Sequence, residues 1–274
     1  MKYNLRKRFF KVVKIFFSIF MAINKEYKLI QKKGFEYASS KMEKAHKKRA
    51  KKLYNIAIEQ EGVLIKLCQY LSTRGDFLPA PYIEILSELQ DNVAPLPFSH
   101  LKDFINSSYK NADDIFDYID TTPLASASIA QVHKARLKNG NEVVLKIIKP
   151  HIEKIIDYDF AILDKVFKTF ENLNIIKKRF DLREILNEFI KVTGNELNFK
   201  REAYITKKFN KHFSKWEYLK IPKIYDNLCT NKIIVMEFIN GNKIKRTDEW
   251  KKRNNDPVTI AKRIIEIYLE QLLN

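Results

Sequence analysis

Lys146 is the residue of this chain whose type and setting most clearly indicate chemistry. It lies in the apolar run 143–148, where Val144 and Ile148 share its face of an expected strand. An ammonium on such a face must reach solvent or find an anionic partner. The preceding segment 123–131 consists mostly of small residues, whose consecutive N–H groups can form an anion-binding nest. Together the loop and the lysine predict a site for a phosphate group.

A partner for Lys146 is expected on the following helical segment, 195–213. Glu196 and Glu202 are the candidates, and Asn198 lies four residues before Glu202 on the same helix face. In protein kinases a small loop, a hairpin and a lysine paired with a glutamate grip the ATP phosphates in this order. Each feature alone is usually structural, and the chain has six glycines and no GxGxxG motif. The prediction depends on their order and spacing together.

The elements that position these residues indicate an α+β fold. Asn139 and Gly140 separate two runs with β-branched residues, 131–137 and 142–148, and this pattern predicts a hairpin. A further strand is expected over 232–238. Helices are expected over 57–71, over 82–89, over 150–213 with a break at Thr193 and Gly194, and over 258–273.

The composition favours a polyanionic ligand but not nucleic acid. The chain carries 51 Lys and Arg against 33 Asp and Glu, a formal charge of +18. Its Lys, Asn and Ile content is also typical of AT-rich genomes, so the excess is weak evidence for a site. The Lys-rich run 41–52 contains no aromatic residue for base stacking and is interpreted as a solvated helix face. Cys68 and Cys229 lie far apart without metal spacing, which indicates a reducing compartment.

The N-terminal segment has two interpretations. The apolar stretch 9–23 is interrupted by Lys11 and Lys14 and is too short to span a bilayer. No small-residue cleavage site follows it. The segment is either an amphipathic helix on a membrane surface or an ordinary packed helix, and the second is preferred. A cytoplasmic protein is expected, and peripheral attachment to the inner face of the cell membrane stays open.

Four separated segments carry a resemblance to a known family. Residues 66–74 followed by 89–95 look like a Lys-x-Gly-Gln signature region, and 123–132 is similar to an Ala-rich loop. Residues 196–203 match a Glu-x-Asp helix, and 235–241 resemble a strand that leads into a hinge. In this order, from about residue 57 onward, these segments resemble the UbiB family of atypical kinase-like proteins, which is linked to ubiquinone biosynthesis.

The resemblance implies a domain organisation. Residues 121–241 would form a kinase-like small lobe, an antiparallel sheet with an αC-type helix. A family-specific helical extension, 57–120, would precede this lobe, after a basic N-terminal segment, 1–56. Residues 242–274 would be the hinge and the first helix of a large lobe.

The resemblance also implies roles for individual residues. Lys146 paired with Glu202 would be the catalytic pair that holds the α- and β-phosphates of ATP or ADP, and adenine would meet backbone groups near Glu237 and Ile239. Lys66, Gln69, Glu196 and Asn198 would form the family-signature pocket, which restricts protein-kinase activity. The nucleotide would be covered by Leu124, Ala125, Ser126, Ala127, Ser128, Ile129, Ala130, Gln131 and Val132.

Three departures from the family pattern qualify this expectation. Cys68 stands where the signature has glycine, and Asn198 stands where the family has aspartate. The sequence stops at Asn274, before the point where a kinase fold would reach its catalytic loop and metal-binding aspartate. We therefore expect no metal ligand in this chain, Mg²⁺ only with a large lobe supplied, weak nucleotide binding and negligible turnover.

Two other functions are considered. One is a non-catalytic, pseudokinase-type scaffold or regulator at an anionic membrane surface, with quinone-biosynthesis proteins as partners. The other is a nucleic-acid-binding protein, which no aromatic and basic platform supports.

Overall fold

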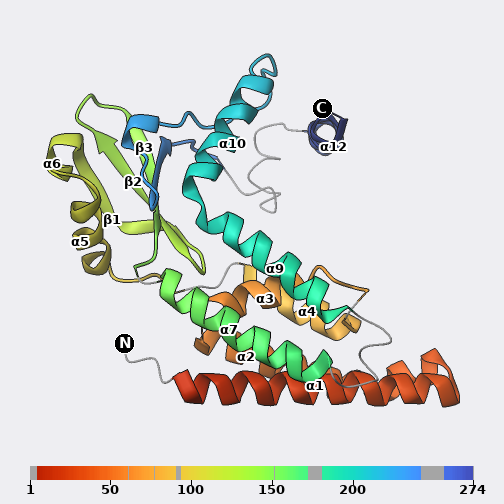
Figure 1. The fold of residues 1–274 in the computed structure, drawn as a ribbon. Helices are drawn as coiled ribbons and strands as arrows, with labels where there is room; N and C mark the ends of the chain where they lie inside the picture. Colours follow the sequence, from red (N-terminus) through yellow and green to blue (C-terminus); the bar gives the residue numbers. More distant parts are fainter. Residues whose placement is uncertain are drawn as a thin grey trace. The chain divides into compact units, whose positions relative to one another are not determined.

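The computed structural model describes residues 5–60, 62–76, 78–90, 94–150, 152–171, 181–241 and 256–273. These belong to two compact units, Met1–Glu237 and Phe238–Asn274, each described by itself. The fold is α+β, as the sequence predicts: the first unit combines helices with a four-stranded antiparallel sheet (Figure 1).

The sheet contains the predicted hairpin and one strand that was not predicted. Its order is β1 (Phe116–Ser126), β2 (Ala130–Leu137), β3 (Glu142–Ile148) and β4 (Ile233–Glu237), and neighbouring strands are antiparallel. Gly140 in the β2–β3 turn has φ 86°, the left-handed conformation that its position requires. The expected small-residue loop is shorter than predicted, because residues 124–126 belong to β1 and residues 130–132 to β2.

The two faces of the sheet pack against different helices. Val143, Leu145 and Ile147 of β3 belong to a small core with α5 (Phe98–Ser108) and α6 (Ala112–Ile115). Ile148 belongs to the larger, mainly helical core on the other face. Since side chains alternate along a strand, Lys146 lies on this second face, the side of the sheet where Figure 1 shows α10.

The N-terminal helices pack along each other. α1 (Leu5–Lys33) and α2 (Phe35–Gln60) are joined at Gly34, whose φ is 83°. α1 buries Val12, Ile15, Phe16 and Ile19 in the larger core, so one face of this helix is packed, as the preferred interpretation expects. In the part of the chain that the structure describes, no helix is long and apolar enough to cross a membrane. The lysines of 41–52 are exposed on α2, as predicted.

The helix expected over 57–71 is interrupted. α2 ends at Gln60, and α3 (Val63–Leu71) begins after Gly62, which has φ 63°. At this break Arg8 of α1 forms a buried ion pair with Asp159, at 2.5 Å, and also donates a hydrogen bond to the carbonyl of Gln60. The helix expected over 82–89 is α4 (Ala80–Ser87), continued by the 3₁₀ turn η1 (Glu88–Gln90).

The helical region after the hairpin breaks at a different residue from the one predicted. It contains α7 (Ile152–Glu171), α9 (Leu182–Leu197) and α10 (Phe199–His212). α9 continues through Thr193 and Gly194, so the predicted break there is wrong. The chain turns at Asn198, whose Oδ1 accepts a hydrogen bond from the Arg201 N–H at 3.0 Å and caps α10.

The remaining elements lie near or after the last strand. The 3₁₀ turn η2 (Asp226–Leu228) packs near β4. In the second unit, α12 (Pro257–Leu273) occupies the range expected for the final helix.

Candidate functional site

Lys146 and Glu202 form an ion pair between β3 and α10. The Lys146 Nζ lies 2.7 Å from both Oε1 and Oε2 of Glu202. The Lys146 side chain is 26 % exposed and that of Glu202 is 33 % exposed, so both groups remain accessible. The ammonium also lies 5.1 Å from the centre of the Phe199 ring, within cation–π range. Phe199 was not predicted to be part of the site. The sequence signal for it was an aromatic residue three positions before Glu202.

The turn between β1 and β2 lies beside the end of β3. The Ala127 N–H donates to the Ala130 carbonyl at 2.8 Å, which closes the turn. The Lys149 N–H donates to the Ile129 carbonyl at 2.8 Å, three residues beyond Lys146. Ser128 is buried, and its hydroxyl has no hydrogen-bond partner among the described residues. Because buried polar atoms are nearly always paired, this hydroxyl is available for a bond that the described residues do not supply.

The other residues expected to cover a nucleotide differ in their surroundings. Leu124 is exposed, and the Ser126 hydroxyl donates a weak 3.4 Å bond to the Ala94 carbonyl. Gln131 is fully buried, and its side chain accepts from the Leu96 N–H at 2.6 Å and donates to the Leu96 carbonyl at 3.3 Å. Its side chain therefore fastens the segment before α5 to β2. Ala125, Ala130 and Val132 lie in the two strands.

The signature residues of α3 lie against α9 and η1. The Lys66 Nζ forms an ion pair with Glu196 of α9 at 2.5 Å. The Gln69 side-chain amide donates to the Leu89 carbonyl at 3.1 Å, which ties α3 to η1. Cys68 lies between Lys66 and Gln69 in the sequence and is completely buried. Burial raises the pKa of its thiol. The side chain that replaces glycine in the signature is thus part of the core.

Asn198 and Glu237 serve local structure. The Asn198 side chain caps α10, at the joint between the helices that carry Glu196 and Glu202. Glu237 pairs with Lys220 at 2.6 Å, and this ion pair holds the pKa of its carboxyl below the usual range. The Glu237 N–H donates to the Lys223 carbonyl at 2.8 Å, so this backbone donor is already used. Ile239 belongs to the second unit and is partly exposed.

The arrangement can hold a polyanion through one positioned ammonium and a short turn. Within the described ranges, no group of three or more His, Cys, Asp or Glu side chains could hold a metal ion. Residues 88–274 match the ABC1 atypical kinase-like domain.

The chain belongs to the ABC1 atypical kinase-like family. This confirms the resemblance to UbiB proteins that the sequence indicated.

Relatives in the family are similar over most of this chain. A "Probable protein kinase UbiB" of Pseudomonas entomophila is 34 % identical over 79 % of this chain and 41 % of its own length. "Protein ACTIVITY OF BC1 COMPLEX KINASE 8, chloroplastic" of Arabidopsis thaliana is 34 % identical over 77 % of this chain and 28 % of its own. The chain therefore spans less than half the length of the curated relatives it matches.

A solved structure is also similar to part of this chain. The complex of Rv3197 with erythromycin, from Mycobacterium tuberculosis, aligns with a TM-score of 0.48 at 27 % identity. The alignment covers 75 % of this chain and 51 % of that one.

Proposed function

We propose that this chain supplies the nucleotide-binding part of a UbiB-like atypical kinase or ATPase, with ATP or ADP as its ligand. The observation that carries the proposal is the ion pair between Lys146 and Glu202. Both oxygens of the carboxylate lie 2.7 Å from the ammonium, so the charge is held in one place while the side chain stays partly exposed. A positioned, accessible ammonium suits the α- and β-phosphates of a nucleotide.

Other residues of the chain would add hydroxyl and backbone contacts to this site. In the turn between β1 and β2, the Ala127 N–H is already bonded to the Ala130 carbonyl. The Ser128 hydroxyl would therefore be the group that faces the phosphates, since it has no partner among the described residues. The Glu237 N–H already donates to the Lys223 carbonyl, so this donor is not available to adenine, and a role for backbone groups near Ile239 rests on the resemblance alone. A bound ATP would supply the phosphoryl group, and these residues would bind and orient it.

The signature residues do not fit a magnesium site. Glu196 is paired with Lys66, and the Asn198 oxygen accepts a backbone hydrogen bond at the start of α10. We therefore assign no Mg²⁺ to the described residues. Support of ubiquinone (isoprenoid quinone) biosynthesis, with proteins of that pathway as partners, rests on the resemblance to UbiB proteins alone.

Replacing Lys146 with methionine is expected to weaken nucleotide binding by about 10- to 100-fold, because a charge-assisted bond contributes about 1.5–3 kcal/mol. Binding of ATP and ADP to residues 1–274 would be followed by ¹⁵N-edited NMR, which detects weak complexes. In the unmodified chain, shifts are expected in β3, the 127–129 turn and the start of α10.

Lys134→Met is the matched control, because Lys134 lies on the adjacent strand and pairs with Glu142 at 2.6 Å. It should bind nucleotide as the unmodified chain does. Equal affinity of Lys146→Met and Lys134→Met, or shifts elsewhere in the chain, would contradict the proposal.

A second candidate role, at an anionic membrane surface, is favoured by the outer face of α1. Phe10, Phe17 and Met21 are 67 %, 51 % and 50 % exposed. Lys14 and Lys25 are exposed at helical spacing between and beyond them. Apolar side chains interleaved with lysines on one helix face can enter the headgroup region of an anionic bilayer.

Changing both Phe10 and Phe17 to serine is expected to reduce binding to phosphatidylglycerol vesicles roughly 10-fold, because the apolar area that leaves water is lost. Flotation of the chain with these vesicles, and with phosphatidylcholine vesicles, measures the effect. Tyr204→Ser, at an exposed aromatic of α10, is the control. Equal flotation with both lipids, or no effect of the double change, excludes this role for α1.

A further inference from the structure

The position of the Lys146 ammonium is set by a single helix. On the sheet, Lys146 stands opposite Val132 of β2 and opposite Ile234 of β4. Both neighbours are apolar, so neither can bind an ammonium. Among the described residues, the ammonium has hydrogen-bond, ion-pair and ring contacts with Glu202 and Phe199, and both belong to α10 (Figure 1).

Phe199 and Glu202 belong to the same closed turn of α10. Phe199 is the first residue of this helix, and the Glu202 N–H donates to the Asn198 carbonyl at 3.0 Å. The Asn198 side chain caps the same turn through the Arg201 N–H. Since residues three positions apart lie on one helix face, the ring and the carboxylate approach Lys146 together.

The Phe199 ring is the more firmly fixed of the two contacts. Its side chain is 1 % exposed and belongs to the larger core, where close packing restricts a side chain to one rotamer. The Glu202 side chain is 33 % exposed and has more rotatable bonds. An ion pair with a partly exposed carboxylate alone holds a lysine weakly, because both side chains lose entropy on pairing.

The contacts of the ammonium leave one donor open. An ammonium has three N–H donors and no acceptor. The two carboxylate oxygens of Glu202 lie 2.7 Å from Nζ and take up to two of these donors. The ring centre of Phe199 lies 5.1 Å from Nζ, where an aromatic face attracts a cation. One N–H is left for a phosphate oxygen, on a side chain that is 26 % exposed.

We propose that Phe199 is a positioning residue for nucleotide binding. The face of its ring holds the Lys146 ammonium beside Glu202, so that the remaining N–H is directed to a phosphate oxygen. A leucine would fill similar space in the core but would attract no cation. The role in ligand binding rests on the proposed nucleotide site, whereas the hold of the ring on the ammonium is a property of the free chain.

Fluorination of the ring at position 199 separates its charge distribution from its shape. In 4-fluoro-, 3,5-difluoro- and pentafluorophenylalanine the ring keeps nearly the same volume, while each added fluorine withdraws negative charge from the ring face. With these residues in place of Phe199, binding of ATP and ADP is expected to weaken in steps, by about 5-fold for the pentafluoro ring. Binding would be followed by ¹⁵N-edited NMR.

A second readout needs no nucleotide. The ¹⁵N relaxation of the Lys146 Nζ signal measures how mobile the ammonium is in the free chain. The signal is assigned by its loss in Lys146→Met and recorded in cold, mildly acidic buffer, where ammonium hydrogens exchange slowly. Mobility is expected to rise with each step of fluorination. A ring that only filled the core would leave it unchanged.

Phe189 is the matched control position. Its side chain is also 1 % exposed in the larger core, and its ring contacts with described residues are those with Tyr70 and Phe160 rather than with a cation. The same three fluorinated residues at position 189 should change neither nucleotide affinity nor the mobility of the Lys146 ammonium. Urea unfolding of every chain shows whether a loss of binding reflects a loss of folded protein.

The outcomes separate this role from the nucleotide site itself. If Lys146→Met weakens nucleotide binding but fluorination at position 199 does not, the role of Phe199 is overturned and the nucleotide site stands. Equal effects at positions 199 and 189, or an ammonium of constant mobility in all chains, would also overturn it. If no chain binds nucleotide but mobility rises with fluorination at position 199 alone, the ring does hold the ammonium, and the proposed nucleotide ligand is wrong.

Discussion

Replacing Arg8 with methionine is expected to lower the free energy of unfolding by about 3–5 kcal/mol, the usual cost of leaving one member of a buried ion pair alone. The Arg8 and Asp159 side chains are only 4 % and 6 % exposed. Arg8 donates to both Asp159 oxygens, at 2.6 and 2.5 Å, and to the Gln60 carbonyl at the end of α2. Without the guanidinium, the buried carboxylate of Asp159 loses its main partner.

Urea unfolding at pH 7, followed by circular dichroism, measures this effect. Arg6→Met is the matched control, because Arg6 lies on the same helix and is exposed; it should change stability by less than about 0.5 kcal/mol. The double change Arg8→Met with Asp159→Leu should recover much of the loss, because it removes the unpaired charge. A loss below about 1 kcal/mol for Arg8→Met would show that the pair does not hold α1 in place.

Acidification is expected to destabilise the chain through His46. The folded state holds the pKa of His46 at about 4, below its unfolded value of about 6.5. The stability that comes from the neutral ring is therefore complete above pH 6.5 and is lost as the pH falls toward 4. At pH 5 the loss is about 2 kcal/mol. Glu26, Arg49 and Tyr82 are the charged and titratable groups near the ring.

The measurement compares the stability at pH 7.5 and pH 5.0 in three chains. Carboxylates with lowered pKa also lose stabilising charge in acid, so the informative quantity is the difference between chains. His46→Gln should lose less stability than the unmodified chain over this interval, and His100→Gln, at an exposed histidine, should lose as much. Identical losses in all three chains would contradict the assignment to His46.

The strands of the hairpin were predictable because their signals are local. Asn139 and Gly140 set the turn, and the apolar runs on either side define β2 and β3. β1 was missed because Pro123 and several polar residues interrupt its pattern. The structure tolerates them because β1 is the edge strand and its register is irregular around Pro123.

The break between α2 and α3 depended on residues far away in the sequence. The left-handed conformation of Gly62 lies where Arg8 and Asp159 meet, and a side chain there would contact Asp159 at 3.4 Å. Sequence reasoning from 57–71 alone sees only a continuous helical pattern. The same limit explains Gln131, whose partner is the backbone of Leu96, 35 residues earlier.

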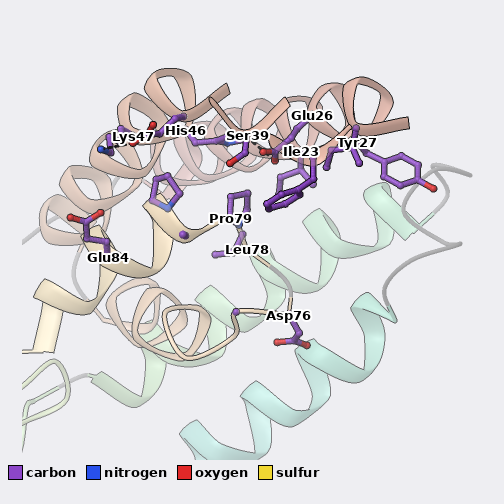
Figure 2. Close-up of a pocket in the computed structure, with 16 residues that line it drawn as sticks. Ile23, Glu26, Tyr27, Ser39, His46, Lys47, Asp76, Leu78, Pro79 and Glu84 are labelled. Carbon is purple, nitrogen blue, oxygen red and sulfur yellow. Dashed lines mark ion pairs between the residues drawn. The ribbon is translucent and has the colours of Figure 1, made fainter. Parts of the chain in front are cut away.

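The side-chain contacts of this fold differ in how far the sequence could indicate them. Lys146 and Glu202 were found because a lysine in an apolar strand is unusual and because the order of segments resembled a known family. The contact between Glu26 of α1 and His46 of α2 (Figure 2) has no such pattern, since both residues stand at spacings that fit ordinary helices. Only the packing of these helices brings the two side chains together.

The cap at Asn198 has a mechanical consequence. Glu196, the partner of Lys66, ends one helix, and Glu202, the partner of Lys146, begins the next. One capped joint thus carries the counter-ions of two lysines that stand on different elements, α3 and β3. Because both carboxylates lie next to this joint, a movement of the joint would displace both of them from their lysines. The helix that carries Lys66 and the strand that carries Lys146 are therefore connected through the joint at Asn198.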